Sequence, residues 1–373
     1  MADAIDYILW RGDLTFDKDP VNDLDICLCS QFVTPDLTGI VSEYVNEKTL
    51  SDVADEYFAN NTMDRSTLGV LQSEYVLPAI RHASKCNRFK DIRLFGYINR
   101  IKTEEQEQFS AVNIMLKDNL LVVSFKGTDD TLIGWREDFD LSCYDEVPAQ
   151  KDALSYLRLA ATRNPKAKII VTGHSKGGNL AIYSAAMIDE HIQKRIVRVV
   201  SFDGPGFRDG FLESEGYKRI KDRCCTIMSQ YAIVGLLLNT PGEHKLVRSR
   251  VPGIWAHDIF NWEVLGKEFV AEEELSMISD IMMRSLRDTL CNLSDDERLE
   301  FNNAFFNALT KTGAKTLTDL ENLDYIKTLT ILQGLSKNKH IENFSRTLIK
   351  ELLKYTSEEV KKERKNEQLR LKG

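Results

Sequence analysis

The chain has 373 residues, with 49 Lys and Arg against 57 Asp and Glu, so its formal net charge is −8 at pH 7. This excess of acid argues against a nucleic-acid partner, because phosphate backbones are bound by broad cationic surfaces. With 43% hydrophobic and 28% charged residues, the composition is that of a globular protein and excludes a disordered or fibrous one. The length predicts one large domain with attachments, or two units.

Targeting and redox signals favour the cytoplasm. Apolar runs such as residues 233–238 fall far short of the roughly 20 residues that a bilayer span requires, so no transmembrane segment is expected. The first six residues carry acid where a secretory signal would carry base. Seven cysteines, an odd number without paired CxxC motifs, predict free thiols rather than disulfides or a metal site. We therefore expect a cytoplasmic protein.

Hydrophobic periodicity changes near residue 90. Residues 1–88 are expected to form a helical segment packed on the core, because Asp52–Phe58 and Ser66–Ile80 place apolar residues three and four positions apart. After this segment, Ile92–Ile98 and Phe109–Leu116 alternate apolar and polar side chains. This alternation predicts a β-hairpin.

Strand and helix patterns then alternate along the chain. The segments Leu120–Phe125, Lys168–Thr172 and Arg198–Phe202 are largely apolar, as expected of strands covered on both faces. Asp152–Thr162 and Gly178–His191 between and after them have the periodicity of helices. The alternation predicts the α/β class, with a mostly parallel central sheet flanked by helices.

The C-terminal third is expected to be helical. We expect the α/β core to span residues 89–268 and a helical extension or cap to span 269–373. Ser294–Glu297 is an N-cap signal, and Glu351–Lys372 predicts a charge-rich final helix. Its mixed charges favour a solvated face, and peripheral attachment to a membrane surface through an amphipathic helix is the alternative.

The strongest local motif is Gly-His-Ser-Lys-Gly-Gly at residues 173–178, directly between an apolar strand and an Ala-rich helix. It has the Gly-x-Ser-x-Gly pattern of a nucleophile elbow, with Ser175 as the nucleophile. Glycine is needed two positions before and after the serine, because a Cβ would clash in the tight turn. The following helix would direct backbone N–H groups at the negative charge of an attacked carbonyl. An elbow whose serine has lost its partners is the alternative.

A second motif follows an earlier strand and carries a resemblance to a known family. It reads Phe-Lys-Gly-Thr at residues 125–128, with Trp135 and Asp138 downstream. Together with Gly-His-Ser-x-Gly-Gly-x-Leu-Ala at 173–181, it resembles the class 3 lipase branch of the α/β-hydrolases. In that family the Phe-Arg-Gly-Thr segment supplies an oxyanion donor, which implies Thr128. The amide after the nucleophile, here that of Lys176, is the expected second donor.

Two further segments narrow the resemblance. Residues 134–139, Gly-Trp-Arg-Glu-Asp-Phe, and residues 202–207, Phe-Asp-Gly-Pro-Gly-Phe, resemble a bacterial branch of these hydrolases called Mbeg-like. The resemblance covers about residues 90–265, and the branch name carries little functional information. The acidic residues beside the second motif are expected to order the oxyanion loop: Asp129, Asp130, Glu137 and Asp138. For Asp130 and Asp138, an exposed position is the alternative.

The catalytic base is sought among six histidines. Chain order in this fold is nucleophile, acid, base, which favours a histidine after the late strands of the sheet. We predict His257 as the base, with His244 as the second candidate. His174 directly precedes the nucleophile, so its side chain is expected to project to the other side of the turn in a structural role. The remaining histidines are expected at the surface: His82, His191 and His340.

The acid is predicted at Asp203, which ends the strand after the nucleophile helix and could hold the imidazole tautomer. The class 3 family usually places its acid one strand later, but the comparable stretch 230–235 has no carboxylate. The acid has therefore moved to Asp203, or the site works as a dyad with a polar orienter or water. For the Lys176 side chain, three roles stay open: attraction of anionic substrates, pairing with a carboxylate, or simple solvation.

These residues predict a serine hydrolase of the lipase or esterase type, which cleaves a carboxylic ester through an acyl-enzyme on Ser175. The resemblance favours acyl esters or lipids as substrates. No metal or organic cofactor is expected, because serine, imidazole and backbone dipoles supply the chemistry. The rival hypothesis is a non-catalytic α/β-hydrolase scaffold used for binding or regulation.

Overall fold

The computed structural model describes residues 2–43, 46–60, 72–102, 107–117, 119–129, 131–232, 234–276, 279, 293–310, 313 and 315–316. Several predictions lie outside these residues: the helix proposed to begin at Ser66, the surface position of His340, the loop role of Asp130 and the final helix Glu351–Lys372. No helix in the described part is long and apolar enough to cross a membrane.

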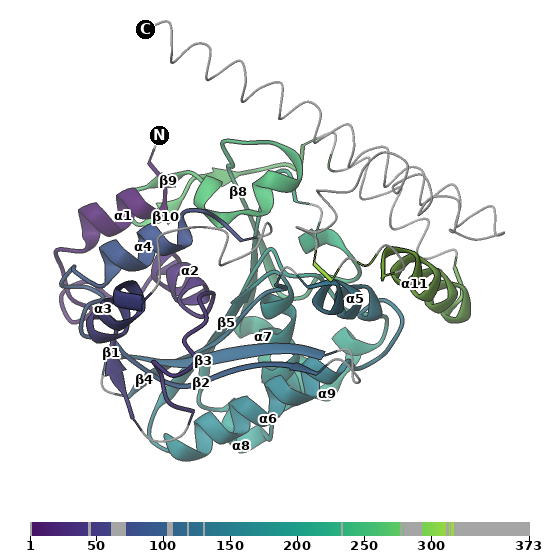
Figure 1. The fold of residues 1–373 in the computed structure, drawn as a ribbon, viewed down its shortest axis with the longest axis horizontal. Helices are drawn as coiled ribbons and strands as arrows, with labels where there is room; N and C mark the ends of the chain where they lie inside the picture. Colours follow the sequence, from purple (N-terminus) through teal and green to yellow (C-terminus); the bar gives the residue numbers. More distant parts are fainter. Residues whose placement is uncertain are drawn as a thin grey trace, which may run out of the picture.

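A nine-stranded mixed sheet forms the centre of the molecule, in the order β1-β2-β3-β4-β5-β6-β7-β8-β11 (Figure 1). Strands β4 to β8 are parallel, and the strands on either side of them are antiparallel. The α/β class is confirmed, and the parallel part carries the predicted site. The strands are β1 (Lys48–Thr49), β2 (Arg93–Lys102), β3 (Glu107–Lys117), β4 (Leu120–Phe125), β5 (Lys168–His174), β6 (Ile196–Phe202), β7 (Cys224–Ser229), β8 (Glu243–Val247) and β11 (Ala271–Glu272).

The predicted hairpin is formed by β2 and β3, and the three predicted apolar strands are β4, β5 and β6. Strand β11 was not expected, because the chain was predicted to be helical from residue 269. Instead, Ala271 pairs with Val247 of β8 and extends the edge of the sheet. This pairing depends on β8, a strand that lies earlier in the sequence, and local periodicity does not reveal such a partner. A separate hairpin precedes it, β9 (Val264–Leu265) with β10 (Glu268–Phe269).

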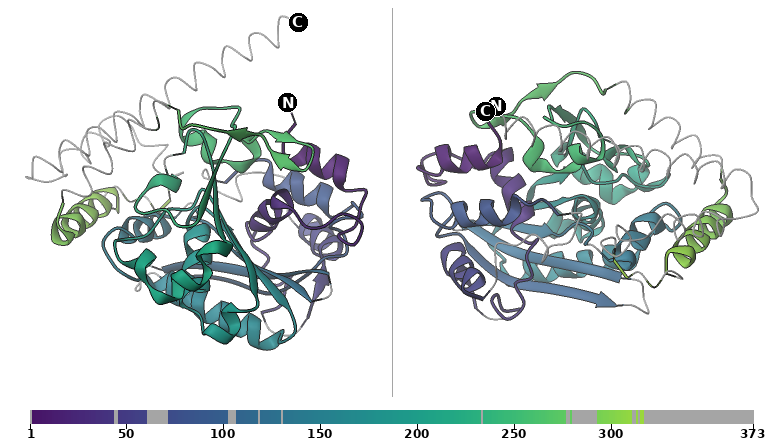
Figure 2. Two further views of the ribbon diagram at one scale, coloured as in Figure 1. Left: turned by 180° about the vertical axis from the view of Figure 1, so that it is seen from behind. Right: turned by 45° about the horizontal axis from the view of Figure 1, so that its top comes forward.

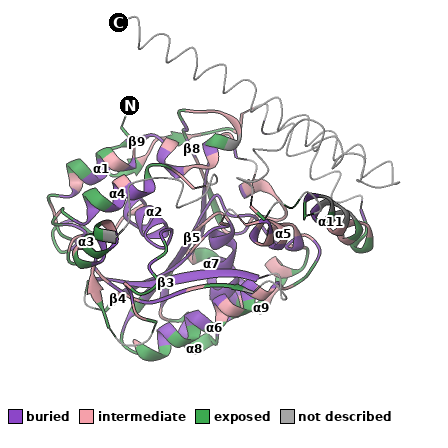
Figure 3. Cartoon of the chain, in the orientation of Figure 1, coloured by how far each residue is buried: buried purple, intermediate pink, exposed green. Residues whose placement is uncertain are grey.

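Helices cover both faces of the sheet (Figures 1 and 3). Val122 and Ile170 face the N-terminal helices, whereas Val123 and Val171 on the same strands face the helices of the core segment. Alternate residues of a strand point to opposite faces, so both hydrophobic clusters share the same strands. The first layer contains α1 (Ala4–Arg11), α2 (Asp23–Gln31), α3 (Leu50–Asn60) and α4 (Val76–Ala83). The second contains α6 (Pro148–Arg163), α7 (Lys176–Met187), α8 (Glu190–Gln193) and α9 (Glu215–Ile220).

A buried ion pair joins the N-terminal helices to the start of the core. Arg88 Nε and Nη2 donate to the two oxygens of Asp25 at 2.7 and 2.6 Å, and both side chains are fully buried. Tyr7 on α1 also donates to Asp25, at 2.8 Å. The pair therefore fixes α1 and α2 relative to the chain that enters β2.

Two helices lie side by side at the far end of the sheet from α1–α4 (Figures 1 and 2). They are α5 (Leu132–Asp140) and α11 (Asp295–Thr310). The rings of Phe139 and Phe306 pack edge to face between them, with centroids 5.5 Å apart. Ser294 caps α11 as predicted, because its hydroxyl accepts the amide of Glu297. Residues beyond the predicted core thus pack onto the loop region that follows β4.

Candidate active site

Ser175 lies in a sharp turn between β5 and α7. Its backbone has φ 56° and ψ −132°, a strained conformation typical of a nucleophile elbow. A Cβ at Gly173 would lie 2.2 Å from the carbonyl carbon of Gly177, and a Cβ at Gly177 would lie 2.2 Å from the oxygen of Phe125. The structure therefore supports the predicted reason for both glycines, since neither position has room for a side chain.

The loop after β4 lies against this elbow. A Cβ at Gly127 would be 3.1 Å from Ser175 Cβ, so only glycine lets the loop approach this closely. The next residue, Thr128, donates its hydroxyl to Asp138 on α5, and its carbonyl accepts Gln72 Nε2 at 2.8 Å. Thr128 is therefore held beside Ser175 from two directions, as the oxyanion role would require.

Asp138 and Asp129 both order this loop. Asp129 Oδ1 accepts the amide of Thr131 at 2.9 Å and also accepts its hydroxyl, which starts α5. Burial raises the pKa of Asp138 to about 6, although the charge of Lys176 and the hydrogen bond from Thr128 lower it. The carboxylate is thus expected to titrate close to neutral pH.

The Lys176 side chain is buried, so two of the three roles left open are wrong. Its ammonium neither projects into solvent nor lies at an open mouth, and its side chain is 0% exposed. It pairs with Glu137 Oε2 at 2.9 Å and also donates to Gln108. Gln108 of β3 and Glu137 of α5 supply all of these acceptors, and the periodicity of the helix that carries Lys176 does not reveal them.

The predicted acid and base are brought together. His257 Nδ1 and Asp203 Oδ2 are 2.6 Å apart, and the Asp203 side chain is 1% exposed. Asp203 follows β6 with φ 49°, and its Oδ1 accepts the amide of Gly235 at 3.0 Å. Residues 230–235, where the class 3 pattern would place the acid, contain no carboxylate. Their Gly235 amide instead donates a hydrogen bond to Asp203.

Three side chains hold the single turn that carries His257. Its last carbonyls, those of residues 255, 256 and 257, accept hydrogen bonds from Asn261, Trp262 and His174 at 3.0, 2.7 and 2.8 Å. The turn is the 3₁₀ helix η5 (Gly253–His257). Neither Asn261 nor Trp262 was predicted, and only their place shortly after the candidate base could have indicated them. A short turn has few backbone bonds of its own, so these contacts fix the imidazole.

The position predicted for the His174 side chain is wrong, although its contacts are structural. Rather than project away, its ring packs on that of His257, with centroids 4.5 Å apart and planes at 36°. Its Nε2 must donate to the His257 carbonyl, which fixes the tautomer. Burial, followed by the charge of His257, lowers the pKa of His174 to about 3. His174 therefore stays neutral when His257 is protonated.

The second candidate base does not join this cluster. His244 lies on β8, is exposed, and its Nε2 contacts the carbonyl of Thr240 at 3.1 Å. His82 and His191 are exposed, as predicted. Asp258 accepts the amide of Phe260 at 3.0 Å, a cap for the turn that follows His257.

Within the described residues no hydrogen bond joins the Ser175 hydroxyl to the His257 ring. His174, which precedes Ser175 in the chain, nevertheless stacks on that ring, and a Cβ at Gly204 would lie 2.7 Å from the Ser175 carbonyl. Such bonds are often long in unliganded hydrolases and shorten when substrate binds.

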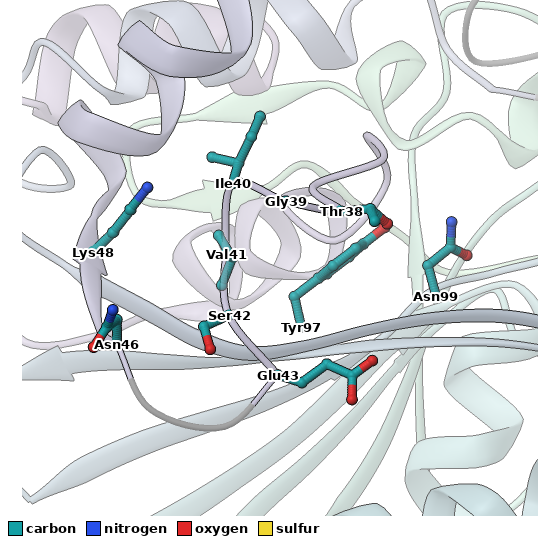
Figure 4. Close-up of a pocket in the computed structure, with 10 residues that line it drawn as sticks. All are labelled: Thr38, Gly39, Ile40, Val41, Ser42, Glu43, Asn46, Lys48, Tyr97 and Asn99. Atoms are coloured by element: carbon teal, nitrogen blue, oxygen red, sulfur yellow. The ribbon is translucent and has the colours of Figure 1, made fainter.

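A cavity of about 340 Å³ lies elsewhere, between the segment 38–43 and β2 (Figure 4). Its lining also includes Asn46, Lys48, Tyr97 and Asn99. None of the five predicted site residues lines it.

A strained serine between a parallel strand and a helix, with an Asp–His pair from segments that follow later strands, defines an α/β-hydrolase fold of the lipase-like type. The chain belongs to the Mbeg1-like family, whose model matches residues 83–307. The predicted resemblance is thereby confirmed.

Solved lipases resemble parts of the chain at low identity. M37 lipase is 19% identical with a TM-score of 0.34, over 44% of this chain and 63% of its own length, less than two thirds. Lipase II from Rhizopus niveus is 15% identical with a TM-score of 0.36, over 52% of this chain and 77% of its own. Nonglycosylated LIP2 lipase from Yarrowia lipolytica is 12% identical with a TM-score of 0.35, over 59% and 80%. No curated protein matches the chain.

Proposed function

We propose that this protein is a serine hydrolase that cleaves carboxylic esters, with acyl esters or lipids as its substrate class. The observation that carries the proposal is the contact of 2.6 Å between Asp203 and His257, beside a serine in a strained elbow. A buried carboxylate on Nδ1 leaves Nε2 of the same ring as the base. The names of the similar lipases agree with this class of substrate.

The proposed reaction follows from these positions. His257 takes the proton of Ser175 as its oxygen attacks the ester carbonyl, and Asp203 stabilises the imidazolium that forms. The amides of Thr128 and Lys176 bind the tetrahedral oxyanion. The imidazolium then protonates the leaving alcohol, and water activated by His257 releases the acyl group from Ser175.

Labelling with a fluorophosphonate tests this proposal, because the probe reacts only with an activated serine. We expect Ser175→Ala to abolish labelling and His257→Ala to slow it by about 10⁶-fold. Asp203→Asn should slow it by about 10⁴-fold if the carboxylate sets the tautomer, as in known triads. His244→Ala is the matched control, since this exposed histidine should leave the rate unchanged.

Ester hydrolysis by chain length then defines the substrate. A folded wild-type protein that neither labels nor hydrolyses short and long acyl esters would contradict the proposal. In that case the non-catalytic scaffold becomes the better hypothesis. Retained labelling in Asp203→Asn would instead favour a Ser–His dyad.

A further inference from the structure

The amide proposed as one oxyanion donor belongs to a residue whose side chain is an internal cation. All three donors of the Lys176 ammonium are used: at 2.8 Å to the Gln108 carbonyl, at 2.7 Å to Gln108 Oε1 and at 2.9 Å to Glu137 Oε2. Although burial lowers the pKa of Lys176, the charges of Glu137 and Asp138 raise it above its ordinary value. The ammonium of Lys176 therefore stays charged in the folded protein.

Glu137 is fixed as firmly as its partner. Its Oε1 accepts the amide of Ala149 at 2.9 Å, and its Oε2 accepts the amide of Gln108 at 3.2 Å besides the ammonium. The Glu137 side chain is 1% exposed. The carboxylate thus joins β3, α5, the start of α6 and the first turn of α7.

The neighbouring residue on α5 holds the other proposed donor. Asp138 accepts the hydroxyl of Thr128, so consecutive carboxylates reach the two sides of the oxyanion site. Successive residues of an α-helix differ by about 100° in direction. A single placement of α5 therefore determines the position of Thr128 and of Lys176 together.

Stability alone does not account for a charged pair in this place. Replacing a buried ion pair by apolar side chains of similar volume is often neutral or stabilising. A leucine at position 176 and another at position 137 would bury apolar groups there without desolvating a charge. The ion pair instead fixes the orientation of the Lys176 side chain, because an ammonium whose three donors are all used can adopt one orientation only.

We propose that Lys176 and Glu137 are positioning residues, which set the geometry of the oxyanion hole by locking the first turn of α7 to α5. This inference rests on the proposed hydrolase function. The pair acts through the Lys176 amide, and neither charged group touches the substrate. It should therefore affect the transition state, in which the oxyanion exists, more than the bound ester.

The test replaces both partners at once, so that no buried charge is left unpaired. In Lys176→Met/Glu137→Leu we expect kcat for a p-nitrophenyl ester to fall about 10- to 100-fold while KM stays within about twofold. The affinity for an alkyl trifluoromethyl ketone, which forms a tetrahedral adduct on Ser175, should fall by the same factor. Loss of packing alone would not lower kcat and the affinity for the adduct by the same factor.

A matched control separates positioning from general loosening. Arg88→Met/Asp25→Leu removes an equally buried pair outside the site and should leave kcat and adduct affinity unchanged, measured where circular dichroism shows each protein to be folded. If the site double variant does not fold, Glu137→Gln, which keeps the shape but removes the charge, should still lower kcat several-fold with KM unchanged.

Two results would overturn the inference. The first is a wild type that is active while Lys176→Met/Glu137→Leu keeps the same kcat and the same adduct affinity. If that variant does not fold, the same result in Glu137→Gln counts instead. The other is an equal loss in the control pair. A wild type that neither labels with fluorophosphonate nor hydrolyses esters would overturn the proposed function as well, so the two failures are distinguishable.

Discussion

His174 shows how a residue beside the nucleophile can serve the base. Its ring packs on the His257 ring, and its Nε2–H donates to the His257 carbonyl at 2.8 Å. An imidazole that remained easily protonated there would repel the imidazolium formed in the reaction. Since burial lowers the pKa of His174 to about 3, this repulsion is avoided at neutral pH.

Replacing His174 by phenylalanine keeps a ring but removes the donor. The unsatisfied carbonyl should cost about 1–3 kcal/mol, and the freed His257 ring should lower the rate of fluorophosphonate labelling by about tenfold. His244→Phe, on an exposed strand, is the control. An unchanged labelling rate in His174→Phe would show that His174 does not hold the His257 ring in place.

Asp140 provides a test by pH dependence of stability. Burial raises its pKa to about 6 from 3.8, and its side chain is 8% exposed. The folded state therefore binds the proton more tightly than the unfolded state, and folding loses stability as pH rises through about 6. The full effect corresponds to about 3 kcal/mol, of which about 1 kcal/mol develops between pH 8 and pH 5.

Asp140→Asn removes this titration. Urea unfolding at pH 8 and pH 5 should show that the variant gains less stability than wild type on acidification, by about 1 kcal/mol. Asp55→Asn, which changes an exposed carboxylate, is the matched control. An unchanged difference between the two pH values would show that Asp140 titrates normally.

At the scale of elements, α5 stands between the proposed oxyanion site and α11. Its Glu137 and Asp138 accept Lys176 and Thr128, and Asp140 at its end accepts Asn302 of α11. Ring packing of Phe139 on Phe306 completes the contact. Movements of α11 should therefore reach the active site through α5.

Phe306→Ala tests this coupling. Loss of a buried phenylalanine should cost about 3–5 kcal/mol, and the loosened α5 should lower kcat several-fold at a temperature where the protein is still folded. Asn307→Ala, on the exposed side of the same helix, should change neither the unfolding free energy nor kcat. Normal kcat in folded Phe306→Ala would show that α11 stabilises without influencing the site.

At the scale of the whole molecule, the N-terminal helices and the sheet share one hydrophobic core. Val122, Ile170 and Val200 of the sheet pack in the same cluster as residues of α1–α4. The division into segments 1–88, 89–268 and 269–373 stays a prediction, but this packing makes independent unfolding of the first segment unfavourable.

Arg88→Leu should therefore destabilise the entire protein rather than its first segment. It leaves the Asp25 carboxylate buried without its partner, which should cost about 3–5 kcal/mol. Circular dichroism and loss of Ser175 labelling should follow one transition on heating. Lys48→Ala, which breaks the more exposed pair with Glu56, should change the midpoint little. Two separate transitions would contradict a shared core.

The sequence by itself determined the features that depend on neighbours in the chain. Alternating and continuous apolar runs predicted β2 to β6, and the glycines around Ser175 predicted the elbow, because steric limits in a tight turn are local. Chain order and a short list of histidines were enough to select Asp203 and His257, which the structure places 2.6 Å apart.

Only the tertiary structure decided the surroundings of these groups. It showed that the Lys176 ammonium pairs with Glu137, that His174 donates to the His257 carbonyl and that the Gly235 amide donates to Asp203. It also added β11 to the edge of the sheet. Each of these contacts joins residues that are far apart in the sequence or lie on opposite sides of a turn. Burial and pairing depend on which elements pack together, and periodicity along one element does not specify its neighbours.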